Sequence, residues 1–119
     1  MKIKWLDKPR KDDYSAAELF LSLTMDPTAA KSAAKRMKKA AMMEVAAKDI
    51  FRASGLSLLG VSNSHVEKDI GRIANGEKLP PLLLFRDKAN NRLIVADGYH
   101  RLCAVYKIEE DAMIPCKIV

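Results

Sequence analysis

The stretch LPPLLLFRDKANNRLIVADGYHRLCAVYKI, residues 79–108, predicts the centre of the fold. Two nearly continuous apolar runs, LPPLLLFR and RLIVAD, flank the polar segment DKANN, which has the length and composition of a hairpin loop. Apolar runs of this kind are typical of strands covered on both faces, so we expect two central strands. Apolar residues at helical spacing then predict a helix, with Leu102, Val105 and Tyr106 facing inward.

The sequence on either side extends this core. MEVAA (43–47) predicts a strand, KDIFRASG (48–55) a helical turn that ends at Gly55, and AMIPCKIV (112–119) a last strand. Ser64 and Glu67 form a capping-box pattern before an amphipathic helix that ends at 75–76. The order β-α-β-β-α-β over residues 43–119 predicts an α+β class, a small mixed sheet with packed helices.

Residues 1–42 predict a helical extension of a single domain. DKPRKDDY (7–14) has the composition of a loop, and Ser15 with Glu18 forms a capping-box pattern for a helix that carries Leu19, Phe20 and Leu23 on one side. Asp26 and Pro27 are typical of the cap and first turn of a second helix.

The bulk composition limits the class of protein. The chain has 119 residues, of which 49% are apolar, and this favours one folded domain over disorder. No apolar run approaches the roughly 18 residues that a membrane span needs, and the N-terminus lacks a secretory signal pattern. Cys103 and Cys116 form neither a disulfide framework nor a zinc motif. We therefore expect reduced thiols, a cytoplasmic protein and no membrane partner.

The net charge of +6 is concentrated near the N-terminus. Residues 1–53 contain 12 Lys and Arg against 7 Asp and Glu, and the excess is greatest in KSAAKRMKKA (31–40). One face of the predicted second helix carries four lysines: Lys31, Lys35, Lys38 and Lys39. This face could bind nucleic acid or an acidic partner, or could simply be solvated. The apolar residues Ala33, Ala34, Met37, Ala41 and Met42 suit either the core or a homodimer contact.

The junction Asp97-Gly98-Tyr99-His100-Arg101 carries the main candidate chemistry. The first amides of a helix lack internal partners and, together with the helix dipole, attract anions. Gly98 would allow a ligand to approach the backbone, Arg101 would bind phosphate oxygens, and His100 would donate or exchange a proton. Asp97 would cap the helix, orient His100, bind a metal ion or act as a base. An ordinary Asp-Gly turn with surface side chains explains the same residues.

The motif DGYHR between a strand and a helix resembles the ParB/sulfiredoxin superfamily over about residues 43–119. The whole chain also resembles a group of small bacterial proteins through the segments WLDKP, KDIFRASGL and ADGYHRLCAVY. In the superfamily this junction holds the phosphates of a nucleotide. The resemblance therefore implies ATP, ADP or another nucleotide, with Mg²⁺, as the ligand.

The match to individual members of the superfamily differs from residue to residue. Gly98, His100 and Arg101 match sulfiredoxins, but Tyr99 stands where their catalytic cysteine would be, so sulfinic acid reduction is not implied. Gly98 and Arg101 match ParB proteins, whereas Cys103 replaces a further arginine, so the ParB switch is not implied. The form Asp-Gly-x-His-Arg is similar to that of free-serine kinases of the superfamily. It implies a phosphate-binding corner, with phosphoryl transfer or hydrolysis as its chemistry and Asp97 and His100 as catalytic candidates.

A second set of ligand contacts is expected from the helix that begins near residue 64. Superfamily members place polar residues of this helix against the nucleotide, and the candidates here are Ser64, His65, Lys68 and Asp69. The only two histidines, His65 and His100, lie at the starts of the two core helices. We expect both helix starts to face one cleft, with His65 and Lys68 joining residues 98–101 in phosphate binding. An ordinary solvated helix turn is the alternative.

Overall fold

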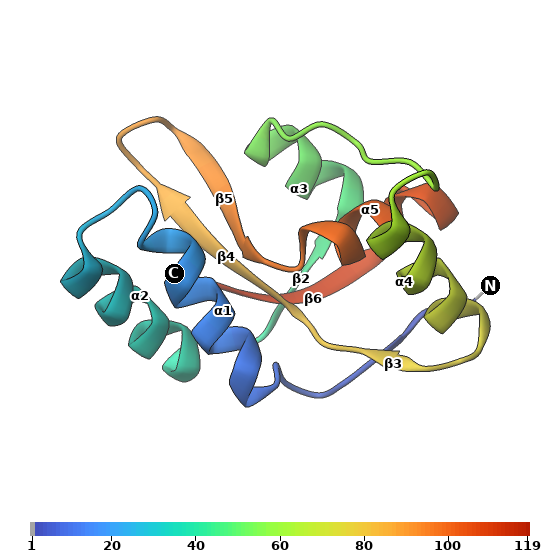
Figure 1. The fold of residues 1–119 in the computed structure, drawn as a ribbon, viewed down its shortest axis with the longest axis horizontal. Helices are drawn as coiled ribbons and strands as arrows, with labels where there is room; N and C mark the ends of the chain where they lie inside the picture. Colours follow the sequence, from blue (N-terminus) through green and yellow to red (C-terminus); the bar gives the residue numbers. More distant parts are fainter. Residues whose placement is uncertain (1) are drawn as a thin grey trace.

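The computed structural model describes residues 2–119, and its helices cover both faces of a mixed four-stranded sheet (Figure 1). Across the sheet the strands are β2 (Met43–Ala46), β6 (Met113–Ile118), β4 (Leu82–Asp87) and β5 (Arg92–Asp97). β6 is antiparallel to β2 and parallel to β4, and β4 and β5 form an antiparallel hairpin. A second, parallel pair joins β1 (Lys4–Trp5) to β3 (Lys78–Leu79). The predicted α+β class is confirmed.

Five helices of the described residues divide between the two faces of the sheet. They are α1 (Lys11–Leu21), α2 (Pro27–Lys39), α3 (Ala47–Ser54), α4 (Ser64–Ala74) and α5 (Tyr99–Ile108). On β4, Leu83 packs with the buried side chains of α1 and α2, whereas Leu82 and Leu84 pack with those of α3, α4 and α5. The apolar run therefore predicted correctly that β4 is central and covered on both faces. No helix within residues 2–119 has the length and apolar character needed to cross a membrane.

β5 is an edge strand, although its sequence predicted a central one. It pairs only with β4 in the four-stranded sheet. Its residues are nevertheless apolar because α1 and α3 pack against it and cover its two faces. An apolar run indicates that both faces of a strand are buried, but it does not indicate whether both edges of the strand are paired.

Both predicted capping boxes are wrong in position. α1 begins at Lys11, within the segment that was expected to be a loop, and the amide of Arg10 donates to the Asp13 carboxylate at 2.7 Å. α4 is capped by the side chain of Asn63, one residue before the predicted Ser64. In each case the residue that begins the helix lies within a few positions of the predicted one, and a capping pattern alone does not decide between such positions. The buried side chains of α1 are Tyr14, Ala17 and Leu21, whereas Leu19, Phe20 and Leu23 are exposed.

The remaining helix boundaries agree with the sequence. The Asp26 side chain accepts a hydrogen bond from the amide of Thr28 at 3.0 Å, and Pro27 occupies the first turn of α2. Gly55 ends α3 with φ of 67°, which is the left-handed conformation that glycine adopts most readily. Ala33, Ala34 and Met37 of α2 are buried in the core, as one of the two predictions for them required, whereas Ala41 and Met42 are exposed.

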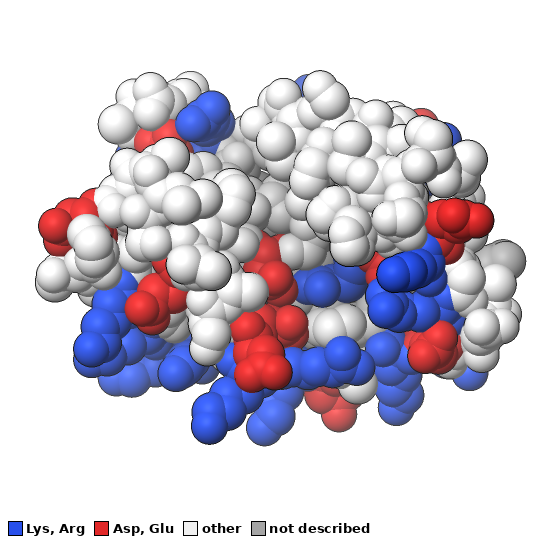
Figure 2. All heavy atoms as spheres, in the orientation of Figure 1, with Lys and Arg blue, Asp and Glu red and all other residues white. Residues whose placement is uncertain are grey.

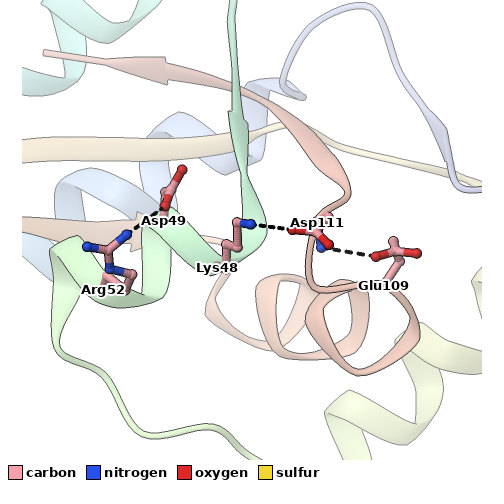
Figure 3. Close-up of polar contacts among 5 residues, drawn as sticks. All are labelled: Lys48, Asp49, Arg52, Glu109 and Asp111. Carbon is pink, nitrogen blue, oxygen red and sulfur yellow. Dashed lines mark hydrogen bonds and ion pairs between the residues drawn. The ribbon is translucent and has the colours of Figure 1, made fainter.

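A polar cluster joins the start of α3 to the turn between α5 and β6 (Figure 3). Lys48 forms an ion pair with Asp111, whose own amide donates to the Glu109 carboxylate at 3.1 Å. The hydrogen bond and the charge of Asp111 raise the pKa of Lys48 above its ordinary value. Within α3, Nη1 of Arg52 lies 3.4 Å from the carboxylate of Asp49. These contacts link α3 to the end of α5, so the cluster helps to fix the position of α3 beside the sheet.

Candidate functional site

α4 and α5 begin at the same hollow on the surface, which has a volume of about 410 Å³. The imidazole of His65, in the first turn of α4, lies beside that of His100, in the first turn of α5. Their ring centroids are 4.8 Å apart with a tilt of 43°. The structure thus brings the two histidines together, as their positions at helix starts suggested. The hollow is lined by His65, Lys68, Asp69, Arg72, Asp97, Gly98, Tyr99, His100 and Arg101.

The two helix starts differ in how their amides are satisfied. At α4 the Asn63 side chain accepts from the amides of His65, at 3.0 Å, and Val66, at 3.2 Å. At α5 the capping residue is Gly98, which has no side chain to accept a hydrogen bond. Within residues 2–119 the amides of residues 99–101 have no hydrogen-bond partner. The start of α5 therefore presents unsatisfied donors beside the hollow, together with the positive end of the helix dipole.

Gly98 allows the sharp turn from β5 into α5. Its φ is 106°, which L side chains rarely adopt. A Cβ atom here would lie 2.8 Å from Cγ of Leu82 and 2.9 Å from Nη2 of Arg101. The backbone at this position therefore packs directly against the core and against the guanidinium group, and only glycine fits without a shift.

Arg101 is held in place on one side of its guanidinium group. Its Nη2 donates to the Asp97 carboxylate at 2.9 Å and to the carbonyl of Pro81 at 3.4 Å. Nε is buried without a hydrogen-bond partner in the described part of the chain. Buried donors are almost always satisfied, and an unsatisfied one points to a water molecule or a ligand. The orientation of Arg101 is thus fixed, while part of its donor capacity is unused.

Asp97 pairs with Arg101 and does not cap α5, which corrects one of the predicted roles. Burial raises the pKa of its carboxyl group above the ordinary value, and Arg101 partly offsets this effect by its charge and its hydrogen bond. The nearby carboxylate of Asp13, from α1, raises the pKa further. A carboxylate with a raised pKa is a stronger base.

The hydroxyl group of Tyr99 is engaged in a structural hydrogen bond. Its hydroxyl donates to the carbonyl of Ser57, in the segment between α3 and α4. Burial raises the pKa of Tyr99 and also that of the neighbouring Cys103 thiol. Tyr99 therefore contributes its backbone amide to the hollow, and its ring ties the start of α5 to the loop.

α4 supplies a polar stripe with helical spacing, formed by His65, Lys68, Asp69 and Arg72. The Asp69 carboxylate is buried and lies 2.6 Å from Nη1 of Arg72. Lys68 is exposed and has no ion pair within residues 2–119. Because each carboxylate of the hollow is paired with an arginine, Lys68 and the two imidazoles leave the hollow with an excess of groups that favour anions.

A second hollow of about 250 Å³ adjoins the first and shares Asp69, Arg72 and Arg101 with it. Its other lining residues come from the start of α1 and from β3 with its two flanking residues: Arg10, Asp13, Glu77, Lys78, Leu79 and Pro80. The residues that sequence reasoning missed are Arg10, Asp13 and Arg72. The i, i+3, i+4, i+7 spacing on α4 could have identified Arg72, whereas no local signal links Arg10 or Asp13 to the junction.

A divalent cation would depend on the ligand for most of its coordination. Residues 2–119 contain no cluster of three or more His, Cys, Asp or Glu side chains that could hold a metal ion. Mg²⁺ commonly binds through one or two carboxylates together with phosphate oxygens and water. Asp97 directly precedes the capping residue Gly98, so it is the carboxylate that would hold a nucleotide-bound Mg²⁺ together with the phosphates.

Models of protein families, curated proteins and solved structures give no match to this chain.

Proposed function

We propose that this protein binds a phosphate-bearing small molecule, a nucleotide, with its phosphates at the start of α5. The observation that carries the proposal is the set of free amides at residues 99–101, beside an arginine whose Nη1 makes no hydrogen bond within residues 2–119. Phosphate oxygens are the acceptors that such a helix start prefers. His65 and Lys68 face the same hollow from α4 and would complete the contacts.

The dimensions of the two hollows suit a ligand of this kind. Small-molecule sites usually have volumes of about 300–1,000 Å³. The first hollow has about 410 Å³ and the adjoining one about 250 Å³, with Arg72 and Arg101 between them. We place the phosphates in the first hollow and the rest of the molecule toward the second, where Arg10 and Lys78 add further donors.

The proposal extends to ATP or ADP with Mg²⁺, and to phosphoryl transfer or hydrolysis. Asp97 would either bind the Mg²⁺ or accept the proton of the attacking hydroxyl, and His100 would donate a hydrogen bond to the transferred group. A β-sheet leading through DGYHR into α5 supports the proposed relation to the ParB/sulfiredoxin superfamily. Both cysteines are free and buried, which supports the proposed cytoplasmic location.

Calorimetric titration with ATP, ADP, CTP and GTP in the presence of Mg²⁺ tests the binding site. At least one nucleotide should bind, and Lys68→Met should weaken its binding about 5- to 20-fold, since one charge-assisted contact to phosphate is lost. Lys107→Met is the matched control, because Lys107 is exposed near the other end of α5, and it should bind like the wild type. No binding of any nucleotide, or equal effects of the two variants, would contradict the proposal.

The basic face of α2 supports a second candidate function, the binding of nucleic acid. α2 carries five cationic side chains and no acidic one, and none of the five forms an ion pair in the described residues. Lys31, Lys35 and Lys39 repeat at four-residue spacing and are exposed. Blue side chains also gather along the lower edge of the molecule, from α2 toward the segment before α1 (Figure 2).

Charge reversal on α2 tests this second candidate. The variant Lys35→Glu/Lys39→Glu should weaken the binding of a 20-base-pair DNA at least tenfold at 50 mM salt, because the contacts would be to phosphates. The logarithm of the wild-type binding constant should fall linearly with the logarithm of salt concentration. An electrophoretic shift assay measures both. Binding that does not respond to salt or to the double variant would exclude the α2 face as a nucleic-acid site.

A further inference from the structure

The outer edge of β5 presents unpaired backbone groups. On β4, the carbonyl of Leu84 accepts from Val119 and the amide of Arg86 donates to Val119, so both residues direct their backbone groups away from β5. Their cross-strand partners are Val95 and Leu93. In an antiparallel pair, two residues opposite one another either both direct their amide and carbonyl groups toward each other or both direct them away from each other. The amides and carbonyls of Leu93 and Val95 therefore point away from β4, at the open edge of the sheet, and they have no partner in residues 2–119.

This edge lies at the bottom of an apolar groove. One wall is formed by Phe20 and Thr24, from the end of α1 and the turn after it, and the other by Ser54 and Leu56, from the end of α3 and the loop after it. The groove has a volume of about 150 Å³. In the view of Figure 2 the surface is hollowed between two mostly uncharged bulges, over the end of α1 and over α3.

Each wall of the groove has an exposed apolar side chain. Phe20 is 47% exposed and Leu56 is 39% exposed. Leu19 and Leu23, adjacent to Phe20, are exposed to 69% and 73%. Isolated apolar side chains need no explanation, but exposed apolar side chains on both sides of an unpaired strand edge are typical of a binding groove.

The groove opens at one end into a basic hollow of about 290 Å³ near the β4–β5 turn. Arg86, Lys88 and Arg92 line this hollow, and Asp87 is its one acidic residue among those described. Asp87 already accepts hydrogen bonds from Asn90 and Arg92, and these bonds lower the pKa of its carboxyl group. The charge that remains for a partner at this end is therefore positive.

We propose that β5 binds an extended peptide segment of another protein as an antiparallel fifth strand. Its backbone would pair with Leu93 and Val95, and its apolar side chains at alternate positions would fill the groove between α1 and α3. β5 begins at Arg92, so the C-terminal end of an antiparallel partner strand would lie beside Arg92. The basic hollow accordingly selects an acidic residue or a free carboxylate at the C-terminal side of the partner segment.

The groove geometry favours a single strand over a second copy of this chain. Adjacent strands lie about 4.8 Å apart, whereas packed helices need about 8–10 Å between their axes. α1 and α3 both pack against β5. Pairing of β5 with its counterpart in a second copy would bring the two α1 helices, and the two α3 helices, closer than their side chains allow.

Fluorescence anisotropy with two labelled octapeptides tests the proposal. Each has six residues of alternating threonine and valine; one ends in two glutamates with a free carboxylate, and the other ends in two amidated lysines. The glutamate peptide should bind the full chain at least tenfold more tightly at 50 mM salt. In the bound peptide every second backbone amide faces β5 and donates a hydrogen bond to it. N-methylation of these amides should therefore remove binding. Bound peptide should also slow hydrogen exchange at Leu93 and Val95.

Variants of the protein locate the contact. Lys88→Glu should reduce the preference for the glutamate peptide at least tenfold, whereas the matched control Lys107→Glu, far from the groove in sequence and on another element, should leave it unchanged. Three results would overturn the proposal: no saturable binding of the glutamate peptide, equal binding of the N-methylated peptide, or slow exchange at Leu93 and Val95 before peptide is added. The last result, with a doubled mass in light scattering, would indicate that a second copy occupies the edge.

Discussion

Replacing Arg101 with methionine should weaken nucleotide binding about 10- to 100-fold. The methionine keeps most of the length of the side chain but removes every donor of the guanidinium group. A hydrogen bond to a charged group contributes about 1.5–3 kcal/mol, and each 1.4 kcal/mol corresponds to a factor of about ten in affinity. Titration calorimetry with the nucleotide that binds the wild type most tightly measures the loss. Affinity within twofold of the wild type would place the phosphates elsewhere.

The same variant should also make the stability of the protein more dependent on pH. Asp97 and Arg101 side chains are only 16% and 15% exposed, so removal of the arginine leaves a carboxylate largely buried without its partner. Burial already raises the pKa of Asp97, and Arg101 opposes this rise. In Arg101→Met the pKa of Asp97 should rise further. The loss of stability near pH 7 should be roughly 3 kcal/mol, as for other broken buried ion pairs.

The sign of the pH effect follows from proton linkage. A carboxyl group with a higher pKa in the folded than in the unfolded state binds its proton more tightly when folded. Its contribution to stability is fully present below the unfolded pKa of about 3.9 and is lost as the pH rises through the folded pKa. The deficit of Arg101→Met should therefore shrink between pH 7 and pH 4, as measured by urea unfolding. The double variant Asp97→Asn/Arg101→Met is the control, and its deficit relative to the single variant Asp97→Asn should not vary with pH, because neither of these proteins has a carboxyl group at position 97.

The elements that sequence predicted well are those whose contacts are local. β4, β5 and α5 follow one another along residues 82–108, and the hairpin and the Asp-Gly junction determine how they connect. The apolar pattern of this stretch therefore contained nearly all the information needed to place Gly98, His100 and Arg101 at one corner. The proximity of His65 was an inference from topology, and it held because α4 and α5 pack side by side.

The features that sequence missed depend on contacts between distant segments. Asp13 influences Asp97 only because α1 packs against β5, more than 80 positions further along the chain. Likewise, the edge position of β5 follows from the pairing of β4 with β6 on its other side, and no residue of β5 itself encodes that order. Alternation and capping patterns describe one segment at a time. The groove beside β5 and the second hollow, which are built from several segments, were for this reason absent from the sequence analysis.

Gly98→Ala should destabilise the protein by roughly 3 kcal/mol, or about 10 °C in melting temperature for a domain of this size. Two costs contribute. A φ of 106° strains any residue with a Cβ atom, and the new methyl group would lie 2.8 Å from Cγ of Leu82, a side chain that is completely buried and cannot move aside freely.

The matched control is Gly71→Ala, for which the opposite sign is expected. Gly71 lies within α4, and a Cβ atom there would meet no atom within 4 Å. Since alanine is favoured over glycine in a helix by roughly 0.8–1 kcal/mol, this variant should melt slightly above the wild type. Gly98→Ala should also weaken nucleotide binding, because its methyl group would lie 2.9 Å from Nη2 of Arg101 and displace the guanidinium group. If thermal melting shows equal stability for Gly98→Ala and the wild type, the tight turn into α5 is not as the structure has it, and the free amides lose their fixed position.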